Sequence, residues 1–337
     1  MGKVTIKDVA KAAGVSYATV SRAFSGSSEI GEETKKRILR LSDAMGYMPN
    51  SVARSMVKKR TDTFGLVIPS IQNPYMSEFA SCLEQRARKL GYSVMVCNSY
   101  YDPDNERSVL KLLLGKQVDG LFLMPIGSEP YDAAIPLSKY VPTVFIGENL
   151  KDLSQPYVSV DNYAGANMGT KYLYSLGHRN ILYLGARKNS VTHEKRLQGY
   201  IDACMELGIQ ADFLNSGFQR SSQQNGYMLA KHLFEKPLKH TAIFCSADSL
   251  AIGVMQAADE IGLRIPADVS LMGFDNIAFT SLPRISLTTI DQSIDAMAEA
   301  ALSLMLAEIS GRPDALRHRT LKPSIVERTS CKMVDCK

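Results

Sequence analysis

Apolar residues at helical spacing predict a short helix over residues 6–13, near the start of the chain. They share one face of that helix: Ile6, Val9, Ala10 and Ala13. Thr5 stands at the expected N-cap, and Asp8 three residues later completes a capping box. Gly14 should end the helix, because glycine tolerates the positive φ of a C-terminal cap. A tight turn is therefore expected directly after residue 13.

A second helix is predicted after this turn, with Ser16 as its N-cap. Its apolar stripe continues through Val20 with Ala23 or Phe24. Its outer face carries Tyr17, Ala18, Ser21 and Arg22. Two short helices joined by a tight turn are typical of a helix-turn-helix DNA reader, although a plain helical hairpin with a solvated basic face has the same spacing.

The side chains of the second helix suit a recognition helix, whose N-terminal turn meets base edges in the major groove. Arg22 can bind guanine through O6 and N7, and Tyr17 can offer a ring and a hydroxyl. The hydroxyls of Ser16, Thr19 and Ser21 can hold phosphates.

A third helix over residues 32–45 can close a three-helix core with Ile38, Leu39, Leu41 and Met45. Gly46 ends it, and Pro49 blocks its continuation. Asn50 can then cap a new short helix whose apolar residues are Val52, Ala53 and Met56. A helix of about nine residues is unstable in isolation, so this segment should fold conditionally. The alternative is a plain basic linker that ends in residues 58–60.

From residue 64 the pattern changes to apolar runs of strand length that alternate with helices. In the first half, strands are predicted at 64–70, 93–99, 120–125 and 143–147, and helices at 75–90, 105–114 and 130–139. In the second half, helices are predicted at 163–176, 195–207, 224–234 and 249–261, and strands at 180–185, 242–246 and 270–274. Short connections favour an α/β class over α+β. Parallel sheets bind ligands beyond the carboxyl ends of their strands, so two facing sheets make a cleft.

The carboxyl ends of the predicted strands nominate residues that can meet a ligand in this cleft. The first strand delivers Ser70, followed by Asn73 and by Tyr75, whose ring can stack on a sugar or a base. Arg196 can donate a two-pronged hydrogen bond to vicinal hydroxyls or a carbonyl. Asp275 can accept hydrogen bonds from hydroxyl or N–H donors.

Other polar residues near the predicted strand ends have two interpretations. Asp248 can reach the cleft or cap the helix that follows it. Asp161 and Asn162 pose the same choice, with capping slightly favoured. The loop before Arg196 holds Ser190, Thr192 and His193, which can line the pocket, although a lone loop histidine is usually solvated.

The net charge of +5 over 337 residues is unevenly distributed. Residues 1–60 hold 12 Lys and Arg against 5 Asp and Glu, whereas the remaining residues hold 27 against 29. The basic charge therefore belongs to the amino-terminal segment, where phosphates would be met. Charge alone does not establish DNA binding, because most basic segments are simply solvated. The length suggests two or three domains.

The cysteines predict neither a disulfide framework nor a metal site, because they lack C-x-x-C and Cys/His ligand spacing: Cys82, Cys97, Cys204, Cys245, Cys331 and Cys336. No signal peptide is evident and no apolar run approaches about 18 residues, so we expect a cytoplasmic protein without a membrane partner. No G-x-G-x-x-G follows the first strand, and G-x-x-x-x-G-K-[ST] and G-x-S-x-G are absent. The sequence thus argues against an enzyme and predicts no cofactor.

TIKDVAKAAGVSYATVSRAFSG, followed by ETKKRILRLSDAMGYMPNSVARSM, resembles the amino-terminal module of the LacI/GalR transcription regulators. The resemblance continues, less densely, through NPY, KQVDGLFLMP, LGHRNILYLG, KRLQGY, ADSLAIGVMQAADEIGLRIPADVSLMGFDN and LTTIDQ. It implies an α-helical helix-turn-helix DNA-binding head. It also implies an α/β bilobed core, similar to periplasmic binding proteins, with two doubly wound parallel sheets.

The resemblance also implies the division of the chain. It gives a helix-turn-helix domain at 1–46, a hinge helix and linker at 47–60, a core N-subdomain at 61–161 with 292–322, and a core C-subdomain at 162–291 with 323–337. In the family the hinge helix forms on the operator, pairs with its twofold mate and wedges an apolar side chain into the minor groove. Met56 stands where the family usually has leucine, and methionine is a more flexible wedge.

Site residues follow from matching positions. The expected DNA contacts are Thr5, Ser16, Tyr17, Ala18, Thr19, Ser21, Arg22, Asn50, Ala53 and Met56. Tyr17 and Ala18 fall where the family varies with the operator, and Arg22 should anchor the register. The expected effector contacts are Ser70, Asn73, Tyr75, Thr192, Arg196, Asp248 and Asp275. Arg196 and Asp275 match the main polar ligand contacts of the family.

One departure bears on the effector. Many sugar sensors of the family have aspartate at the position of Ser70, so the serine puts a standard pyranose in doubt. A furanose, nucleoside, nucleobase or small glycoside stays open.

The resemblance predicts a ligand-responsive transcriptional regulator, most simply a repressor, that binds a near-palindromic operator as a homodimer. A dimer is preferred to a tetramer because no leucine heptads follow VERTS. Two alternatives are an enzyme on a doubly wound scaffold, against which the missing motifs argue, and a solute-binding protein of a transporter. The latter shares the bilobed body, but the DNA-reading head and the missing export signal argue against it.

Overall fold

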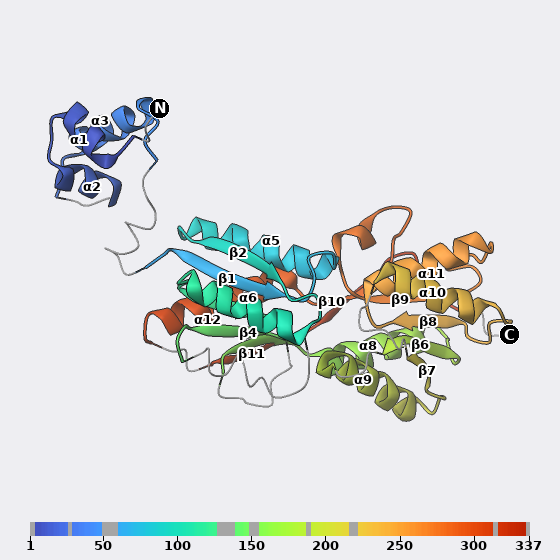
Figure 1. Ribbon diagram of the computed structural model, residues 1–337. Coiled ribbons are helices and arrows are strands. Elements are labelled where there is room, and N and C mark those ends of the chain that lie inside the picture. The colour runs from blue at the N-terminus through green and yellow to red at the C-terminus, as the bar shows by residue number, and fades with distance from the viewer. Residues whose placement is uncertain are drawn as a thin grey trace. The chain divides into compact units, whose positions relative to one another are not determined.

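The computed structural model describes residues 4–25, 29–48, 60–126, 139–147, 155–186, 190–215, 222–312 and 316–334. The chain separates into two compact units, Met1–Thr61 and Asp62–Lys337 (Figure 1). They are called the head and the core below, and each is described by itself.

The head is built from three helices: α1 (Ile6–Ala13), α2 (Tyr17–Ser25) and α3 (Glu32–Ala44). They enclose a small apolar core of Val9, Ala10, Ala13, Val20, Ala23 and Ile38. The Asp8 carboxylate accepts hydrogen bonds from the Thr5 backbone N–H at 2.8 Å and from its hydroxyl at 2.7 Å. Gly14 caps the other end of α1 with a φ of +63°. The predicted capping box and glycine stop are thus confirmed.

The first sheet of the core has the strand order β11-β5-β4-β3-β1-β2, and its described strand pairs are all parallel. Its strands are β1 (Thr63–Ile68), β2 (Ser93–Asn98), β3 (Gly120–Leu123), β4 (Thr143–Ile146), β5 (Tyr157–Val160) and β11 (His318–Leu321). Phe64 and Leu66 pack on one face with α5 (Pro74–Lys89) and α12 (Ile294–Ile309). Val67 packs on the opposite face with α6 (Pro103–Gly115), as alternation along a strand requires (Figure 1).

The second sheet has the order β12-β10-β9-β8-β6-β7. Its strands are β6 (Ile181–Ala186), β7 (Asp212–Asn215), β8 (Ala242–Cys245), β9 (Ser270–Asp275), β10 (Thr288–Asp291) and β12 (Ser324–Val326). Its helices are α8 (Asn162–Ser175) and α9 (Val191–Leu207), with α10 (Gln223–Phe234) and α11 (Asp248–Glu260). Tyr183 packs in the cluster that includes α8 and α9, and its neighbour Leu184 packs with α10 and α11.

The chain crosses between the two sheets after β5, after β10 and after β11. Each sheet with its helices is called a lobe below, the first sheet forming the first lobe and the second sheet the second lobe. All strands except β12 therefore direct their carboxyl ends toward the space between the lobes. The last crossing explains one departure from the predicted parallel sheets. β11 ends at the cleft, so β12 starts there and runs away from it, antiparallel to β10.

Most elements predicted within the described residues exist, with ends shifted by a few residues. α9 begins at Val191 rather than at 195. The helix expected at 130–139 falls largely outside the described residues. The predictions omitted β5, β7, β10, α12, β11 and β12. The subdomain boundaries stay a prediction.

Candidate functional site

A cavity lies between the two sheets of the core, where the carboxyl-end rule places it. Residues one or two positions after strand ends line it: Pro69, Met124, Gly147 and Ala247. Its polar wall includes Asn73, Asn162, Thr192, Arg196, Asp275 and Gln292. The site is thus assembled from turns that belong to both lobes.

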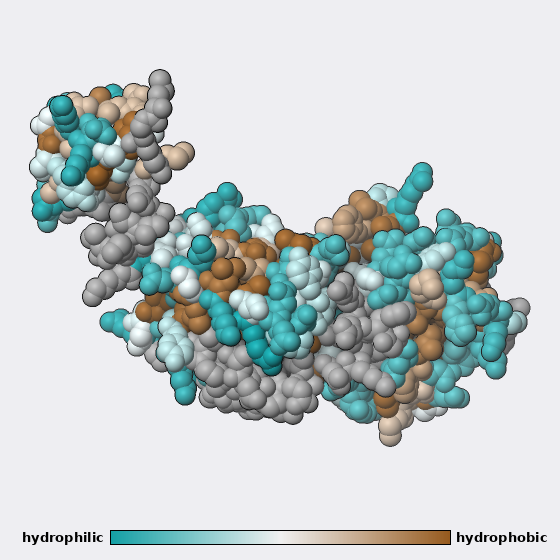
Figure 2. Space-filling view, viewed as in Figure 1, coloured by the Kyte–Doolittle hydropathy of each residue, from teal (hydrophilic) through white to brown (hydrophobic). Residues whose placement is uncertain are grey.

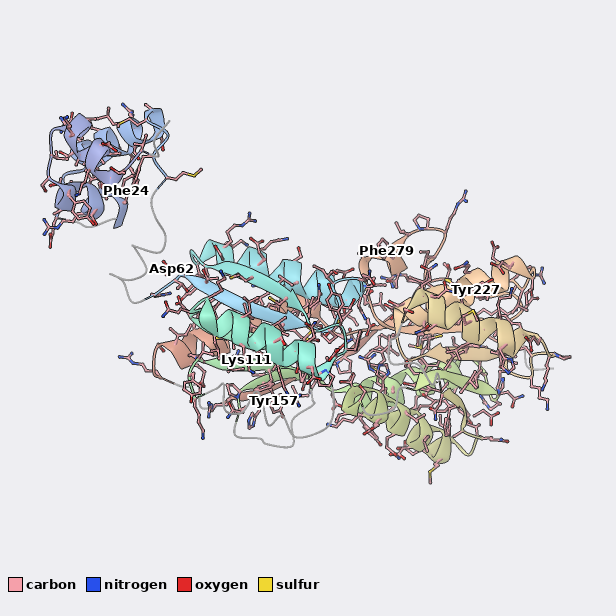
Figure 3. All side chains as sticks on the ribbon, viewed as in Figure 1. Phe24, Asp62, Lys111, Tyr157, Tyr227 and Phe279 are labelled. Carbon is pink, nitrogen blue, oxygen red and sulfur yellow. The ribbon has the colours of Figure 1, made fainter. Side chains whose placement is uncertain are left out.

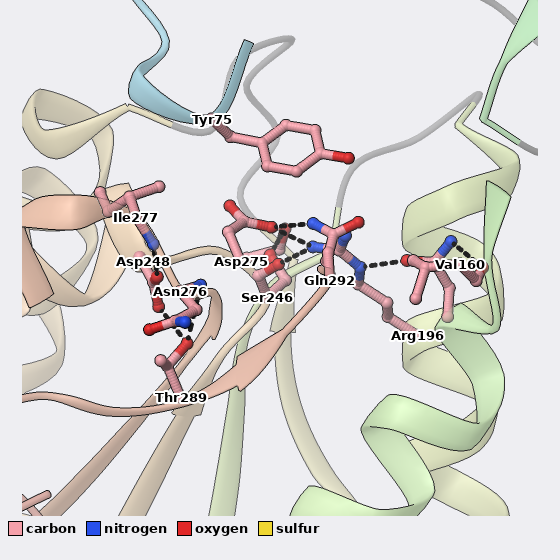
Figure 4. A network of polar contacts seen from close by, with 12 residues as sticks. Tyr75, Val160, Arg196, Ser246, Asp248, Asp275, Asn276, Ile277, Thr289 and Gln292 are labelled. Carbon is pink, nitrogen blue, oxygen red and sulfur yellow. Dashed lines mark hydrogen bonds and ion pairs between the residues drawn. The ribbon is translucent and has the colours of Figure 1, made fainter. Parts of the chain in front are cut away.

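Arg196 is the centre of the polar wall (Figure 4). It projects from the first turns of α9 and is only 4% exposed. Its Nε donates to Asn162 Oδ1 at 2.7 Å, and its Nη1 donates to the backbone oxygen of Ser246 at 2.6 Å. The same Nη1 lies 3.2 Å from Asp275 Oδ1. The guanidinium also lies over the Phe274 ring, 3.6 Å from its centre.

Asp275 ends β9 with a φ of +127°, a backbone conformation that side-chain-bearing residues rarely adopt. The carboxylate accepts from Arg196 and from Gln292 Nε2, the latter at 2.5 Å. Burial raises the pKa of Asp275, and the Arg196 guanidinium opposes that shift. Loss of Arg196 would therefore leave a buried acid that resists ionisation.

Asp248 lies behind this wall rather than on it. Its side chain is 0% exposed and does not line the cavity. One carboxylate oxygen accepts from the Ile277 backbone N–H at 3.0 Å, and the other accepts from Thr289 Oγ1 at 2.5 Å. It is the first residue of α11 and caps no helix with its side chain. Both interpretations made from the sequence are corrected: Asp248 holds the turn after β9 that presents Asp275.

Of the other predicted cleft residues, three line this cavity and one lies elsewhere. Asn73, Tyr75 and Thr192 line the cavity beside Arg196. Asn73 also caps α5, since its Oδ1 accepts from the Tyr75 backbone N–H at 3.0 Å. Ser70 does not line this cavity; it lies on the wall of a second, neighbouring one.

Asp161 caps α8 by accepting from the Ala164 backbone N–H at 2.9 Å, whereas Asn162 lines the cavity and holds Arg196. Gln292 was missed from the sequence. It directly follows β10, so the carboxyl-end rule finds it once that strand is assigned. Phe274 was also missed, because its contact with the Arg196 guanidinium depends on a distant helix.

On the head, α2 presents Tyr17, Ala18 and Arg22 to solvent. Ser16 Oγ accepts from the Thr19 backbone N–H at 3.1 Å, so the predicted N-cap is confirmed. Arg22 Nε forms an ion pair with Glu29 Oε2 at 3.1 Å. A carboxylate therefore lies beside the expected guanine reader.

The remaining expected DNA contacts Asn50, Ala53 and Met56 lie outside the described residues. Within the described ranges, no group of His, Cys, Asp and Glu suits a metal ion, and no helix is long and apolar enough to span a membrane.

A three-helix head with an exposed second helix, followed by a bilobed core that encloses a polar cavity, defines a DNA-binding regulator with a ligand-binding core. Relatives support this class. The model of bacterial regulatory proteins of the lacI family matches residues 5–50, and that of the periplasmic binding protein-like domain matches residues 170–331. The chain is 33% identical to the HTH-type transcriptional repressor PurR of Mannheimia succiniciproducens, over 98% of this chain and 99% of that protein.

Two solved structures are similar over their full lengths. The lac repressor dimer bound to operator and the anti-inducer ONPF has a TM-score of 0.82 and 27% identity, covering 98% of this chain and 100% of that one. A periplasmic binding protein/LacI transcriptional regulator from Alkaliphilus metalliredigens QYMF, complexed with D-xylulofuranose, has a TM-score of 0.72 and 28% identity, covering 80% and 99%. The chain belongs to the LacI family of bacterial regulatory proteins, and it is a DNA-binding transcriptional regulator.

Proposed function

We propose that the protein is a cytoplasmic repressor that binds a near-palindromic operator as a homodimer and responds to a small sugar-like or nucleoside-like effector in the interlobe cavity. The observation that carries the proposal is the buried pair of Arg196 and Asp275 on the cavity wall. Charged side chains that are already paired and oriented lose little conformational entropy when they bind the hydroxyls of a ligand, so more of the hydrogen-bond energy contributes to affinity. The cavity is therefore suited to a ligand rich in hydroxyl or N–H groups.

The DNA-reading half of the proposal concerns α2. Its exposed Tyr17, Ala18 and Arg22 would enter the major groove and read base edges, while Ser16, Thr19, Ser21 and Thr5 would meet the backbone. Asn50, Ala53 and the Met56 wedge would act in the minor groove between half-sites. The similarity of the head to lacI-family regulators over residues 5–50 supports these roles.

The dimer would be formed by two copies of the core. β2 is an edge strand, and its Met95 and Val96 are 36% and 38% exposed. Figure 2 shows an apolar surface in this area, between α5 and α6. An apolar edge strand is a liability in a monomer, and a second copy of the same surface would cover it.

A sugar-like effector is supported by the neighbouring structure that holds D-xylulofuranose. Effector binding would shift the relative angle of the two lobes, and only a difference in affinity between two lobe arrangements can do this. The lobes touch outside the crossing segments, where Glu78 Oε1 of α5 accepts from the Ala278 backbone N–H at 2.8 Å. Such a contact would differ between the arrangements and would be transmitted to the hinge at 47–60.

The DNA-reading half is tested with the full chain and a duplex selected from a random library. Arg22→Ala should abolish discrimination between the selected duplex and a scrambled one. Arg40→Ala removes the same charge from α3. It should weaken binding to both duplexes by the same factor and therefore keep the discrimination between them. A footprint that persists unchanged in Arg22→Ala would show that α2 is not the reading helix.

The alternative function is solute delivery to a transporter. It shares the core but makes no use of a basic head, in which 12 Lys and Arg stand against 5 Asp and Glu over residues 1–60. Recovery of the protein from outside the cell membrane, with no duplex selected by the full chain, would favour that alternative.

A further inference from the structure

An acidic side chain lies beside the expected guanine reader of the head. Arg22 Nε forms an ion pair with Glu29 Oε2 at 3.1 Å, and the two side chains are 55% and 67% exposed. Arg22 belongs to α2, whereas Glu29 belongs to the turn that precedes α3. The pair therefore links the reading helix to a neighbouring element, on a surface that a duplex can reach.

Apolar contacts with the core of the head hold the backbone near both partners of this pair. Phe24, which is labelled in Figure 3, lies two positions after Arg22 on α2, and its ring centre is 5.6 Å from that of Tyr47. Ile30 directly follows Glu29 and packs against the same core as Phe24. Because both backbones are held in this way, Glu29 can restrict the direction in which the guanidinium of Arg22 points.

The geometry of the pair suits the recognition of guanine. A guanidinium has two edges on which it can meet a pair of acceptors, one formed by Nε with an Nη group and the other formed by both Nη groups. Glu29 contacts Nε. The edge with both Nη groups is therefore the one that would meet O6 and N7 of a guanine.

A carboxylate at this place has two opposite effects on DNA binding. An arginine loses rotamer freedom when it binds a base edge, and a carboxylate that already holds the side chain reduces that loss. The same carboxylate repels the phosphates of every duplex, whatever its sequence. Glu29 should therefore lower the general affinity for DNA and raise the preference for guanine.

We propose that Glu29 is a specificity-determining residue that orients Arg22 toward a guanine of the operator. It is a positioning residue, because it acts through the guanidinium of Arg22 and does not itself contact the base. The inference rests on the proposed function, in which α2 reads the major groove. It extends that function by naming the residue that makes the reading by Arg22 selective.

The test measures the affinity of the full chain for the selected duplex and for a scrambled one, by fluorescence anisotropy at one salt concentration. Glu29→Ala should bind the scrambled duplex more tightly than wild type does, and should reduce the ratio of selected to scrambled affinity by about threefold to tenfold. Glu32→Ala is the matched control, since it removes the same charge and breaks an exposed ion pair with Lys35 at 3.5 Å. It should raise the affinity for both duplexes by the same factor and keep the ratio.

A second measurement isolates the contact with the base. 7-Deazaguanine, which lacks the N7 acceptor, replaces each guanine of the selected duplex in turn. The guanine read by Arg22 is the one whose replacement weakens binding of wild type but not of Arg22→Ala. At that position the loss of affinity should be about threefold or more smaller in Glu29→Ala than in wild type. In the Arg22→Ala background, Glu29→Ala should no longer change the ratio, because no guanidinium is left to orient.

Three outcomes overturn the inference: Glu29→Ala keeps the wild-type ratio, Glu29→Ala lowers the ratio equally with and without Arg22, or no guanine of the selected duplex depends on Arg22. If Arg22→Ala abolishes the discrimination and Glu29→Ala does not reduce it, α2 remains the reading helix and only the role of Glu29 fails. If Arg22→Ala itself leaves the discrimination unchanged, the assignment of α2 in the proposed function fails, and the inference fails with it.

Discussion

The two lobes contribute chemically different walls to the cavity beside Arg196. The second lobe provides the hydrogen-bonding side chains Asn162, Thr192, Arg196 and Asp275. The first lobe adds Asn73 to these polar groups but provides mainly apolar or aromatic ones: Tyr75, Met76, Met124, Ile126, Ile146 and Met297. We call these the polar wall and the apolar wall.

The members of the polar wall bond to one another within the second lobe and its crossing segment, so protein contacts alone orient them. The apolar wall can stabilise a bound ligand only by packing over it and burying its surface. A ligand can therefore be selected by the second lobe and then favour the arrangement in which the first lobe closes over it. This division would supply the differential affinity that the proposed lobe movement needs.

The largest effect is expected from Asp275→Ala. Removing the acid leaves Arg196 buried without its partner, which should lower the free energy of unfolding by about 3–5 kcal/mol and abolish effector binding. Chemical denaturation and calorimetry measure both. Asp259→Ala, an exposed acid on α11, is the control and should change neither. Normal effector affinity in Asp275→Ala would refute the role given to the polar wall.

Asn162→Ala tests whether the polar wall is a connected unit. It removes the acceptor of Arg196 Nε at 2.7 Å, so the guanidinium should lose orientation without losing Asp275. We expect a loss of about 1–3 kcal/mol in effector binding, measured by calorimetry. An unchanged affinity would mean that Ser246 and Asp275 alone orient the arginine.

Glu78→Ala breaks a contact between the lobes outside the crossing segments. Its hydrogen bond to the Ala278 N–H helps to hold the lobe arrangement seen here, so its loss should change the affinity for the effector by about 0.5–1.5 kcal/mol. Glu84→Ala on the same helix serves as the control. Equal affinities in the two variants would show that this contact does not discriminate between lobe arrangements.

The smallest effect is expected from Tyr75→Phe on the apolar wall. The Tyr75 hydroxyl donates to Met297 Sδ at 3.3 Å, and sulfur is a weak acceptor. Effector affinity measured by calorimetry should change by about 0.5 kcal/mol or less. A loss of effector affinity as large as that of Asn162→Ala would show that the Tyr75 hydroxyl binds the effector. The first lobe would then contribute a polar contact, and the two walls would not differ as described.

The sequence predicts the parts of this molecule whose pattern is local. Continuous apolar runs located β1, β3, β4, β6, β8 and β9, and the capping box located α1. Short strands with exposed or polar positions, such as β7 (Asp212–Asn215) and β11 (His318–Leu321), lack that pattern. α12 is apolar over much of its circumference, because it packs in the core of the first lobe, so it shows little amphipathic periodicity.

The site residues also differ in how far the sequence could predict them. Asp275 follows from a strand end, and both Asp275 and Arg196 follow from the family pattern. Asp248 could not be assigned correctly, because its partners Ile277 and Thr289 lie 29 and 41 residues away. Ser70 follows β1 as expected, but whether it lines the cavity beside Arg196 or the neighbouring one depends on α10 and α11 of the other lobe.

The most direct test of the account is an effector titration of the full chain bound to its selected duplex, followed by fluorescence anisotropy in wild type and Asp275→Ala. The account predicts that the effector changes operator affinity by about tenfold or more in wild type, whereas Asp275→Ala binds the duplex but does not respond. An equal response in both proteins would contradict the claim that the cleft controls the DNA-reading head.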